Sequence, residues 1–169
     1  MKNQKFTSAG TSVNSRNLPS AFRRFAPLGR VLDWGCGRFS DNTREYCLSR
    51  GASEYYPYDK FNLSDTLNDY SWIRGFNINT AYCCNVLNVI AEDDIIKDII
   101  RVVCSRLAVG GCAIFQIYEG NRSGIGRETK KDCYQRNLKT EEYLPFFLCL
   151  PARYTYERHY NYIVVTYKK

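Results

Sequence analysis

The sequence has little of what metal sites and membrane spans require. It has one histidine, His159, among 169 residues, and none of its cysteines form a C-x-x-C pair. A structural zinc site needs paired Cys or His ligands at short spacing, so we expect no bound metal. No run of 18 or more apolar residues occurs, so we expect no membrane-spanning helix. Residues 1–10 lack the apolar segment of a secretory signal, and we expect a cytoplasmic protein.

Cysteine is abundant, but no two of the eight cysteines stand at C-x-x-C spacing. Several of the eight cysteines lie inside apolar stretches, among them Cys83, Cys84 and Cys112. Small apolar side chains of this kind pack well in a core, and intracellular thiols stay reduced. The pattern therefore predicts reduced cysteines that serve as core residues.

Length and charge indicate one domain with basic ends. A chain of 169 residues that is 44% hydrophobic suits a single core. We expect a basic arm over residues 1–27 and one folded domain over residues 28–169. Residues 1–30 hold six basic residues and no acid, and residues 119–169 hold ten against six, whereas residues 31–118 hold eight against eleven. Basic ends favour an anionic partner, nucleic acid being the first candidate, although such a charge can also serve solubility alone.

Strand and helix patterns alternate along the chain. Strands are expected at 30–34, 54–58, near 72–73, at 80–85 and 112–118, and a final hairpin at 153–157 and 160–167. Helices are expected at about 17–25, 40–50, 92–109 (stopped by Gly110 and Gly111) and 140–150, with a polar loop between 119 and 137. The order predicts an α/β sandwich whose sheet is mostly parallel with one antiparallel C-terminal strand.

The sequence VLDWGCG at residues 31–37 carries the strongest chemical signal. It joins a short strand, an acidic residue, a Gly-x-Gly turn and a helix. Glycines allow backbone to approach a ligand at the carboxyl end of a strand, where open α/β sheets bind ligands. Asp59 ends the next strand, in the position where a carboxylate accepts ribose hydroxyls.

A nicotinamide site is the main competing interpretation of this motif. The third glycine of the dinucleotide fingerprint is replaced by Ser40, and Asp33 would face a diphosphate with like charge. S-adenosylmethionine has no phosphate and presents an ammonium and a sulfonium, both of which a carboxylate attracts. The residues therefore favour the methyl donor over a dinucleotide.

These motifs resemble those of class I, Rossmann-like S-adenosylmethionine-dependent methyltransferases, over about residues 28–118. VLDWGCG is similar to their first motif, and Asp59 to the acidic position after their second strand. The resemblance implies S-adenosylmethionine as cofactor and the cofactor-binding residues Asp33, Gly35, Cys36, Gly37, Asp59, Lys60, Phe61, Asn85 and Val86. The stretch NVLNVI at 85–90 also resembles small methyltransferases of phages and bacterial DNA-modification loci, which would place the protein in a host cytoplasm.

The chain departs from the motifs that define an acceptor in nucleic-acid enzymes. Amino-methylating enzymes carry Asx/Ser-Pro-Pro-aromatic after the fourth strand, whereas residues 85–88 here read NVLN. Cytosine C5 enzymes need a Pro-Cys nucleophile, and Cys83 and Cys84 have no preceding proline. The named nucleic-acid chemistries are therefore not predicted by motif.

The segment 119–137 is the predicted acceptor side, because loops at the carboxyl edge of such sheets hold specificity. The same segment could instead be a solvated connector. Tyr118 and Glu119 are candidate catalytic bases or simply strand-end residues, and His159 is expected at the surface of a hairpin turn. The candidate substrate-binding residues are Arg122, Arg127, Lys130 and Lys131.

We therefore predict an S-adenosylmethionine-dependent methyltransferase whose acceptor is nucleic acid. A small-molecule or protein acceptor, and a non-catalytic module that binds cofactor or nucleic acid, remain open alternatives.

Overall fold

The computed structural model describes residues 3–11, 17–68 and 77–168. Its main sheet has six strands in the order β2-β1-β3-β4-β8-β7, and a separate two-stranded sheet pairs β5 with β6. The strands are β1 (Gly29–Trp34), β2 (Ala52–Tyr58), β3 (Ile78–Cys84), β4 (Leu107–Gln116), β5 (Arg127–Lys130), β6 (Cys133–Gln135), β7 (Tyr154–His159) and β8 (Tyr162–Tyr167). The helices are α1 (Ser20–Arg24), α2 (Ser40–Ser49), η2 (Leu87–Val89), α4 (Asp93–Ser105), η3 (Thr140–Tyr143) and α5 (Leu144–Phe147).

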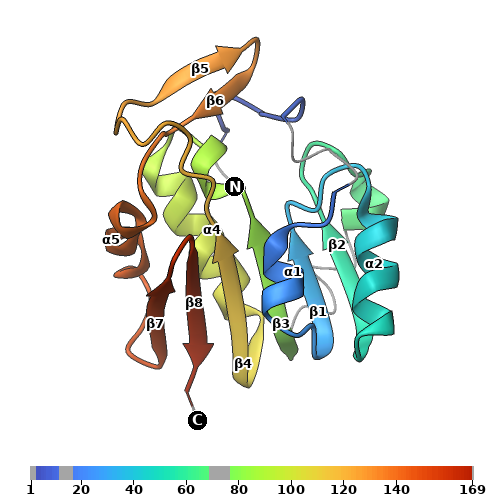
Figure 1. The fold of residues 1–169 in the computed structure, drawn as a ribbon. Helices are drawn as coiled ribbons and strands as arrows, with labels where there is room; N and C mark the ends of the chain where they lie inside the picture. The colour runs from blue at the N-terminus through green and yellow to red at the C-terminus, as the bar shows by residue number, and fades with distance from the viewer. Residues whose placement is uncertain (1–2, 12–16, 69–76, 169) are drawn as a thin grey trace.

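Strand direction in the main sheet confirms the predicted fold class. β1 pairs in parallel with β2 and β3, and β3 pairs in parallel with β4. β8 is antiparallel to β4, and β7 is antiparallel to β8. Among the described strands of this sheet, β8 alone therefore runs against the others. The carboxyl ends of β1 to β4 meet at one edge, which is the upper edge in Figure 1.

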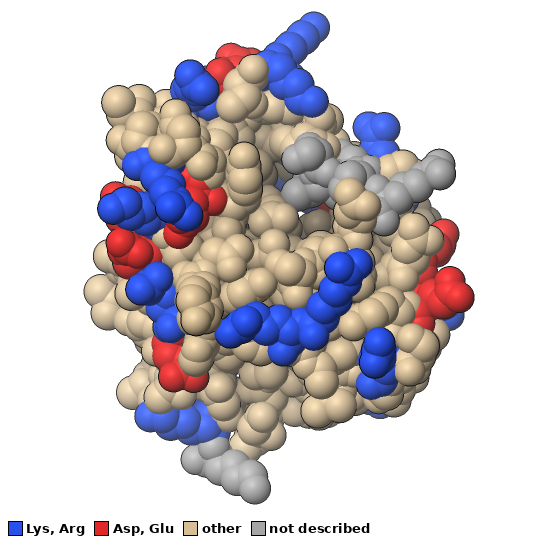
Figure 2. All heavy atoms as spheres, in the orientation of Figure 1, with Lys and Arg blue, Asp and Glu red and all other residues tan. Residues whose placement is uncertain are grey.

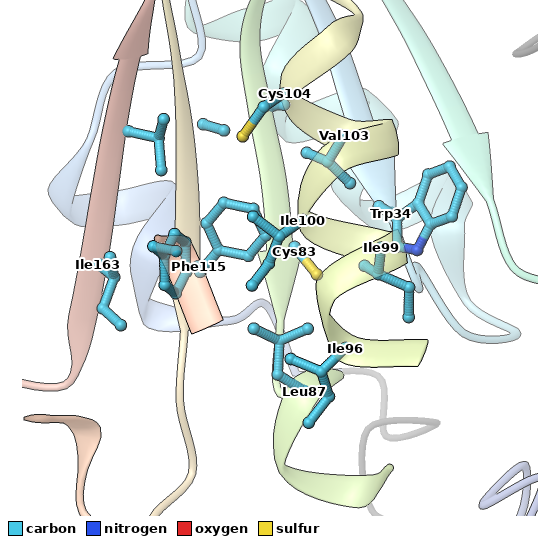
Figure 3. Close-up of a cluster of buried hydrophobic side chains, with 14 of the residues drawn as sticks. Trp34, Cys83, Leu87, Ile96, Ile99, Ile100, Val103, Cys104, Phe115 and Ile163 are labelled. Carbon is cyan, nitrogen blue, oxygen red and sulfur yellow. The ribbon is translucent and has the colours of Figure 1, made fainter. Parts of the chain in front are cut away.

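Helices cover both faces of the sheet. α4 and α5 pack on one face, where Ile96, Ile100 and Phe147 join the larger core. α1 and α2 lie on the other face, where Phe22 and Cys47 are fully buried. Figure 3 shows α4 directing its isoleucines toward Phe115 and Cys83 of the sheet. Because α1 belongs to this core, the end of the predicted arm is part of the folded domain.

The prediction for α4 was right in its start and wrong in its end. Its isoleucines and Val103 recur at helical spacing and are buried, and two acids lie in its first turn. We expected Gly110 and Gly111 to stop the helix, but it ends at Ser105 and both glycines lie within β4. The reason is Leu107, which is buried in the core, while the Ile78 N–H bonds to the Arg106 carbonyl and begins strand pairing there.

Two C-terminal predictions also need correction. The segment 119–137 is not an open loop, because it contains the β5–β6 hairpin. Asp132 takes a positive φ of 60° at its turn, and the Glu128 carboxylate accepts the Asp132 N–H at 2.9 Å. The helix expected over 140–150 divides into η3 and the short α5, with Pro145 at the start of α5. The strand expected near residues 72–73 lies outside the described residues.

All eight cysteines are free, and five of them are buried. His159 ends β7 beside the hairpin turn and lies 2.9 Å from the Glu157 carboxylate. Within the described part of the chain, no helix is long and apolar enough to cross a bilayer.

Candidate active site

A cavity opens at the carboxyl ends of β1, β2 and β3. Its floor contains Trp34 and Tyr58, whose rings stack with centroids 4.0 Å apart. Ile95 and Ile99 of α4 form one wall. The sheet thus brings residues from three separate strand ends into one hollow, which is where open α/β sheets bind ligands.

The Gly-x-Gly turn closes one side of this cavity. Gly35 and Gly37 both adopt positive φ, 79° and 72°, which is strained for other residues. The Gly35 N–H donates to the Tyr58 carbonyl at 2.7 Å. A Cβ at Gly35 would come within 2.3 Å of the Val86 Cγ2 atom. The motif therefore uses glycine both for backbone conformation and for close approach to the β3 end.

Asp59 ties the turn to the segment that follows β2. Its Oδ2 accepts the Gly37 N–H at 2.9 Å, and its Oδ1 accepts the N–H groups of Phe61 and Asn62 at 3.0 and 2.9 Å. The Asp59 N–H and carbonyl both bond to the buried Asn68 side chain. The carboxylate lines the cavity and is held by these donors in a fixed orientation.

Asp33 lies on the opposite face of the sheet from the cavity floor. It is 4% exposed, and its Oδ2 accepts the Tyr55 hydroxyl at 2.6 Å. Burial raises the pKa of Asp33 to about 7, more than the Tyr55 hydrogen bond lowers it. Asp33 is not among the residues that line the cavity. Its carboxyl group is therefore bonded to β2 and does not reach the cavity.

Three further predicted residues surround Asp59. Lys60 and Phe61 line the cavity, with the ammonium 5.1 Å from the centre of the Phe61 ring. Cys36 is half-buried and its thiol bonds to the Gly37 carbonyl at 3.5 Å. Burial, with the nearby Asp33 and Asp59 charges, raises the pKa of this thiol. The thiol is therefore protonated at neutral pH and is not a nucleophile.

Asn85 and Val86 lie where this cavity meets a second one. Asn85 takes a positive φ of 58°, and its N–H donates to the Gln116 carbonyl at 2.8 Å. The second cavity, of about 510 Å³, lies beneath the β5–β6 hairpin. The two cavities share Thr11, Asn85 and Val89. Ligands in the two cavities would therefore be neighbours.

The two predicted bases differ in their surroundings. Tyr118 lines the second cavity and is 61% exposed. Glu119 lines only a third, open hollow, accepts the N–H and hydroxyl of Thr140 at 2.8 and 2.7 Å, and lies 2.6 Å from Arg122. Partial burial alone would raise the pKa of Glu119, but the Thr140 and Arg122 contacts outweigh it and lower the pKa. These contacts make Glu119 an anchor for η3 and a weak base.

The basic side chains of the hairpin region do not all line the same cavity. Arg127 and Lys130 line the second cavity, whereas Arg122 lines the third hollow with Glu119. Lys131 is exposed at the hairpin turn and lines none of these cavities. Figure 2 shows Lys and Arg gathered at the hairpin and again over α1, with an uncharged surface between.

The charge of the N-terminal arm predicted that it approaches the ligand-binding edge together with residues 119–137, and residues 3–11 lie there, although over the first cavity. Gln4, Thr7 and Ser8 line the first cavity, and the segment is bound to the hairpin. The Thr7 N–H donates to the Asp132 carboxylate and the Ser8 N–H to the Asp132 carbonyl, each at 2.9 Å. Figure 1 shows this segment beside β6, although the two are more than 100 residues apart. No local pattern in the sequence signals such a long-range contact.

The covering segment leaves little room in the first cavity. Its volume is about 80 Å³, whereas pockets for small molecules span roughly 300–1,000 Å³. A ligand of cofactor size therefore requires residues 4–11 to move outward. Among the described residues, no cluster of three or more His, Cys, Asp or Glu side chains could hold a metal ion.

The fold is similar to that of solved methyltransferases. An S-adenosylmethionine-dependent methyltransferase from Clostridium acetobutylicum matches with a TM-score of 0.53 and 13% identity, covering 83% of this chain and 85% of that one. The 1,6-didemethyltoxoflavin-N1-methyltransferase of Burkholderia thailandensis, solved with its substrate and S-adenosylhomocysteine, matches with a TM-score of 0.59 and 14% identity, covering 94% and 77%. No family model and no curated protein matches the sequence. The chain therefore has the Rossmann-like methyltransferase fold that the sequence predicted.

Proposed function

We propose that this protein is an S-adenosylmethionine-dependent methyltransferase. The observation that carries the proposal is the position of the first cavity. It lies at the carboxyl ends of β1 and β2, between the Gly35–Gly37 turn and the fixed Asp59 carboxylate. The similarity of the fold to solved methyltransferases supports the same activity.

Each group near the cavity suits one part of the cofactor. The turn of Gly35, Cys36 and Gly37 would hold the methionine portion. Asp33 lies outside the cavity, and its pKa of about 7 leaves it only partly ionised at neutral pH, so it would add a partial negative charge at a distance. Asp59 would accept the ribose hydroxyls. Lys60 and Phe61 would lie by the adenine, with Asn85 and Val86 on the side toward the acceptor. Bound there, the cofactor supplies an electrophilic methyl group on a sulfonium, so the chain has mainly to align the acceptor.

Calorimetric titration with S-adenosylhomocysteine tests the cofactor proposal directly. We expect micromolar binding to the full chain, with NAD binding much more weakly because its diphosphate would approach the Asp59 carboxylate. Incubation with S-adenosylmethionine and cell extract should then release S-adenosylhomocysteine. Absence of any response to S-adenosylhomocysteine contradicts the proposal, and binding without turnover would identify a non-catalytic module.

We further propose a nucleic-acid component as the acceptor. Support comes from the basic ends of the sequence and from Arg127 and Lys130 beside the second cavity. Contacts to duplex phosphates make log affinity fall by about 0.9 per log unit of salt for each contact. Replacing Lys130 and Lys131 with Gln should lower both the affinity and this slope. A flat salt dependence would favour a small-molecule or protein acceptor.

Of the two candidate bases, Tyr118 is the better placed. It lines the second cavity, whereas Glu119 is engaged by Thr140 and Arg122 outside it. Tyr118→Phe should lower turnover more than Glu119→Gln if an acceptor proton is removed at this position. Turnover equal to that of the wild type in both variants would exclude both side chains from proton transfer.

A further inference from the structure

The second cavity has a volume suited to a small molecule. At about 510 Å³ it falls within the range of roughly 300–1,000 Å³ that ligand pockets span. It is bounded by the β3 end, the β4 end and the β5–β6 hairpin, and it shares Asn85 and Val89 with the first cavity. An acceptor here would lie beside a cofactor held at the Gly35–Gly37 turn.

Amide side chains dominate the lining of this cavity. The five that line it are Asn85, Asn88, Asn121, Gln135 and Asn137. Gln135 and Asn137 use both ends of their amides in hydrogen bonds within the protein. The donors and acceptors that remain for the edge of a planar nitrogen heterocycle therefore come from Asn85, Asn88 and Asn121. Tyr118 and Tyr134 add aromatic rings, on which a planar ligand can stack.

Hydrogen bonds within the protein fix several of these amides in orientation, including both ends of Asn137. The Asn88 Nδ2 donates to the Gln135 Oε1 at 3.0 Å, and the Gln135 Nε2 donates to the Tyr118 carbonyl at 3.0 Å. The Asn88 side chain is almost fully buried, and its Oδ1 has no hydrogen-bond partner among the described residues. Asn88 Oδ1 is buried in the free protein, so a ligand N–H would bond to it only after the lining around it moves. Such a bond would relieve the free-energy cost of an unpaired buried acceptor.

The charge of the lining is positive. Arg127 and Lys130 contribute the charged groups, and no described residue of the lining is Asp, Glu or His. A cationic acceptor is therefore disfavoured, and an anionic group is attracted to the Arg127 guanidinium. The same lining lacks a carboxylate or imidazole base. Oxygen and carbon acceptors need a proton removed before or during attack, whereas a nitrogen with a free lone pair does not.

From these observations we infer that the second cavity binds the base of a nucleotide and that a nitrogen of this base is the methyl acceptor. This inference rests on the proposed methyltransferase function. The nitrogen lone pair forms the bond to the methyl carbon, the carbon–sulfur bond breaks, and its electron pair remains on sulfur. A proton that the nitrogen then carries passes to water.

The nucleotide could be free or part of a strand with the base turned out of its stack, and one set of ligands distinguishes these sources. The full chain saturated with S-adenosylhomocysteine is titrated with the nucleoside 5′-monophosphates, the matching nucleosides, and short single-stranded DNA and RNA. Each mixture is then repeated with S-adenosylmethionine, and the products are analysed by mass spectrometry for a methyl group on the base.

We expect at least one monophosphate or oligonucleotide to bind and to gain one methyl group on a base nitrogen. A monophosphate should bind about tenfold more tightly than its nucleoside, because the phosphate contacts Arg127. Binding of oligonucleotides alone would support a base within a strand. Methylation on carbon or oxygen, or no nucleotide binding by a chain that binds S-adenosylhomocysteine, overturns this inference and leaves the proposed function intact. Failure to bind S-adenosylhomocysteine overturns both.

Two variants separate the recognition of phosphate from that of the base. Arg127→Gln should weaken monophosphate binding about tenfold and leave nucleoside binding unchanged. Arg44→Gln, which removes the same charge from the exposed surface of α2, is the matched control and should change neither. Asn88→Leu should abolish binding of the base. If Asn88→Leu keeps its affinity for S-adenosylhomocysteine, the variant is folded. If this folded variant still binds the base, the inference is contradicted.

Discussion

On the proposed cofactor side of the candidate active site, the Gly35–Gly37 turn and Asp59 are held by hydrogen bonds between the ends of adjacent parallel strands. On the proposed acceptor side, the β5–β6 hairpin is held by residues 3–11 and by side chains such as Gln135. The first region lies within the main sheet, whereas the second lies above its edge (Figure 1). The first region is therefore held by the hydrogen bonding of the sheet, whereas the second depends on contacts between segments far apart in the sequence.

The largest expected effect concerns Asp33 beneath the cofactor side. Its pKa is raised from 3.8 to about 7, so between about pH 4 and 7 the folded chain holds a proton that the unfolded chain has lost. Stability from this group is present below pH 4 and is lost as the pH rises through 7. The wild-type free energy of unfolding should fall by up to about 1.4 kcal/mol per pH unit relative to Asp33→Asn. Urea denaturation of both proteins from pH 4 to 8 measures this.

The acceptor side supplies a control of opposite sign. The pKa of Glu119 is lowered, so its contribution is present above its ordinary pKa and is lost as the pH falls. Relative to Glu119→Gln, wild-type stability should therefore decrease toward acid.

For the Asp33 prediction, the contradicting outcome is a pair of parallel curves of stability against pH for the wild type and Asp33→Asn. Such curves would show that Asp33 is not buried in a protonated form.

The two regions each contain a glycine with nearly the same backbone conformation. Gly35 has φ 79° and Gly124 has φ 74°, but an added Cβ meets Val86 only at Gly35 and nothing within 4 Å at Gly124. Gly35→Ala should cost about 2–3 kcal/mol of stability and weaken S-adenosylhomocysteine binding about a hundredfold. Gly124→Ala should cost about 1 kcal/mol and leave that binding unchanged. Denaturation and calorimetry measure both, and equal effects would refute the close approach to Val86.

A substitution of Asp59 tests the binding of the cofactor without involving the second cavity. Asp59→Asn keeps the shape of the side chain but replaces one acceptor oxygen with a donor. We expect binding of S-adenosylhomocysteine to weaken by about 1–3 kcal/mol, because the ribose hydroxyls lose an acceptor. Asp65→Asn removes the same charge from an exposed position nearby and is the control. If calorimetry finds both variants equal to the wild type, Asp59 does not bind the ribose.

The smallest expected effect concerns the cover formed by residues 3–11. Asp132→Ala removes the side-chain acceptor of the Thr7 N–H and hydroxyl, so these residues should open more often. Dissociation of S-adenosylhomocysteine, followed by stopped flow, should become severalfold faster. Exchange of the Ser8 amide hydrogen should accelerate with it. Glu157→Ala, on β7, is the control and should leave both rates unchanged. An unchanged dissociation rate in Asp132→Ala would show that residues 3–11 do not control access to the first cavity.

Much of the cofactor side could be predicted because its signals are local. The VLDWGCG motif is a strand and turn in consecutive residues, and the apolar spacing of α4 specifies its buried face. Alternation along a strand places the neighbours Asp33 and Trp34 on opposite faces of the sheet. Which of these two faces carries the cavity could not be predicted from the sequence, and only Trp34 lines it.

By itself, the sequence determined the α/β alternation, the glycine turn and the carboxylate at the end of β2, since each depends on residues close together in the chain. The tertiary structure was needed to show that residues 3–11 cover the first cavity and that Glu119 bonds to Thr140. It was also needed to show that amides from η2, from β6 and from the residue after β3 line one cavity. The physical reason is that these contacts join segments far apart in sequence, and they form only after the sheet has brought its strand ends to one edge.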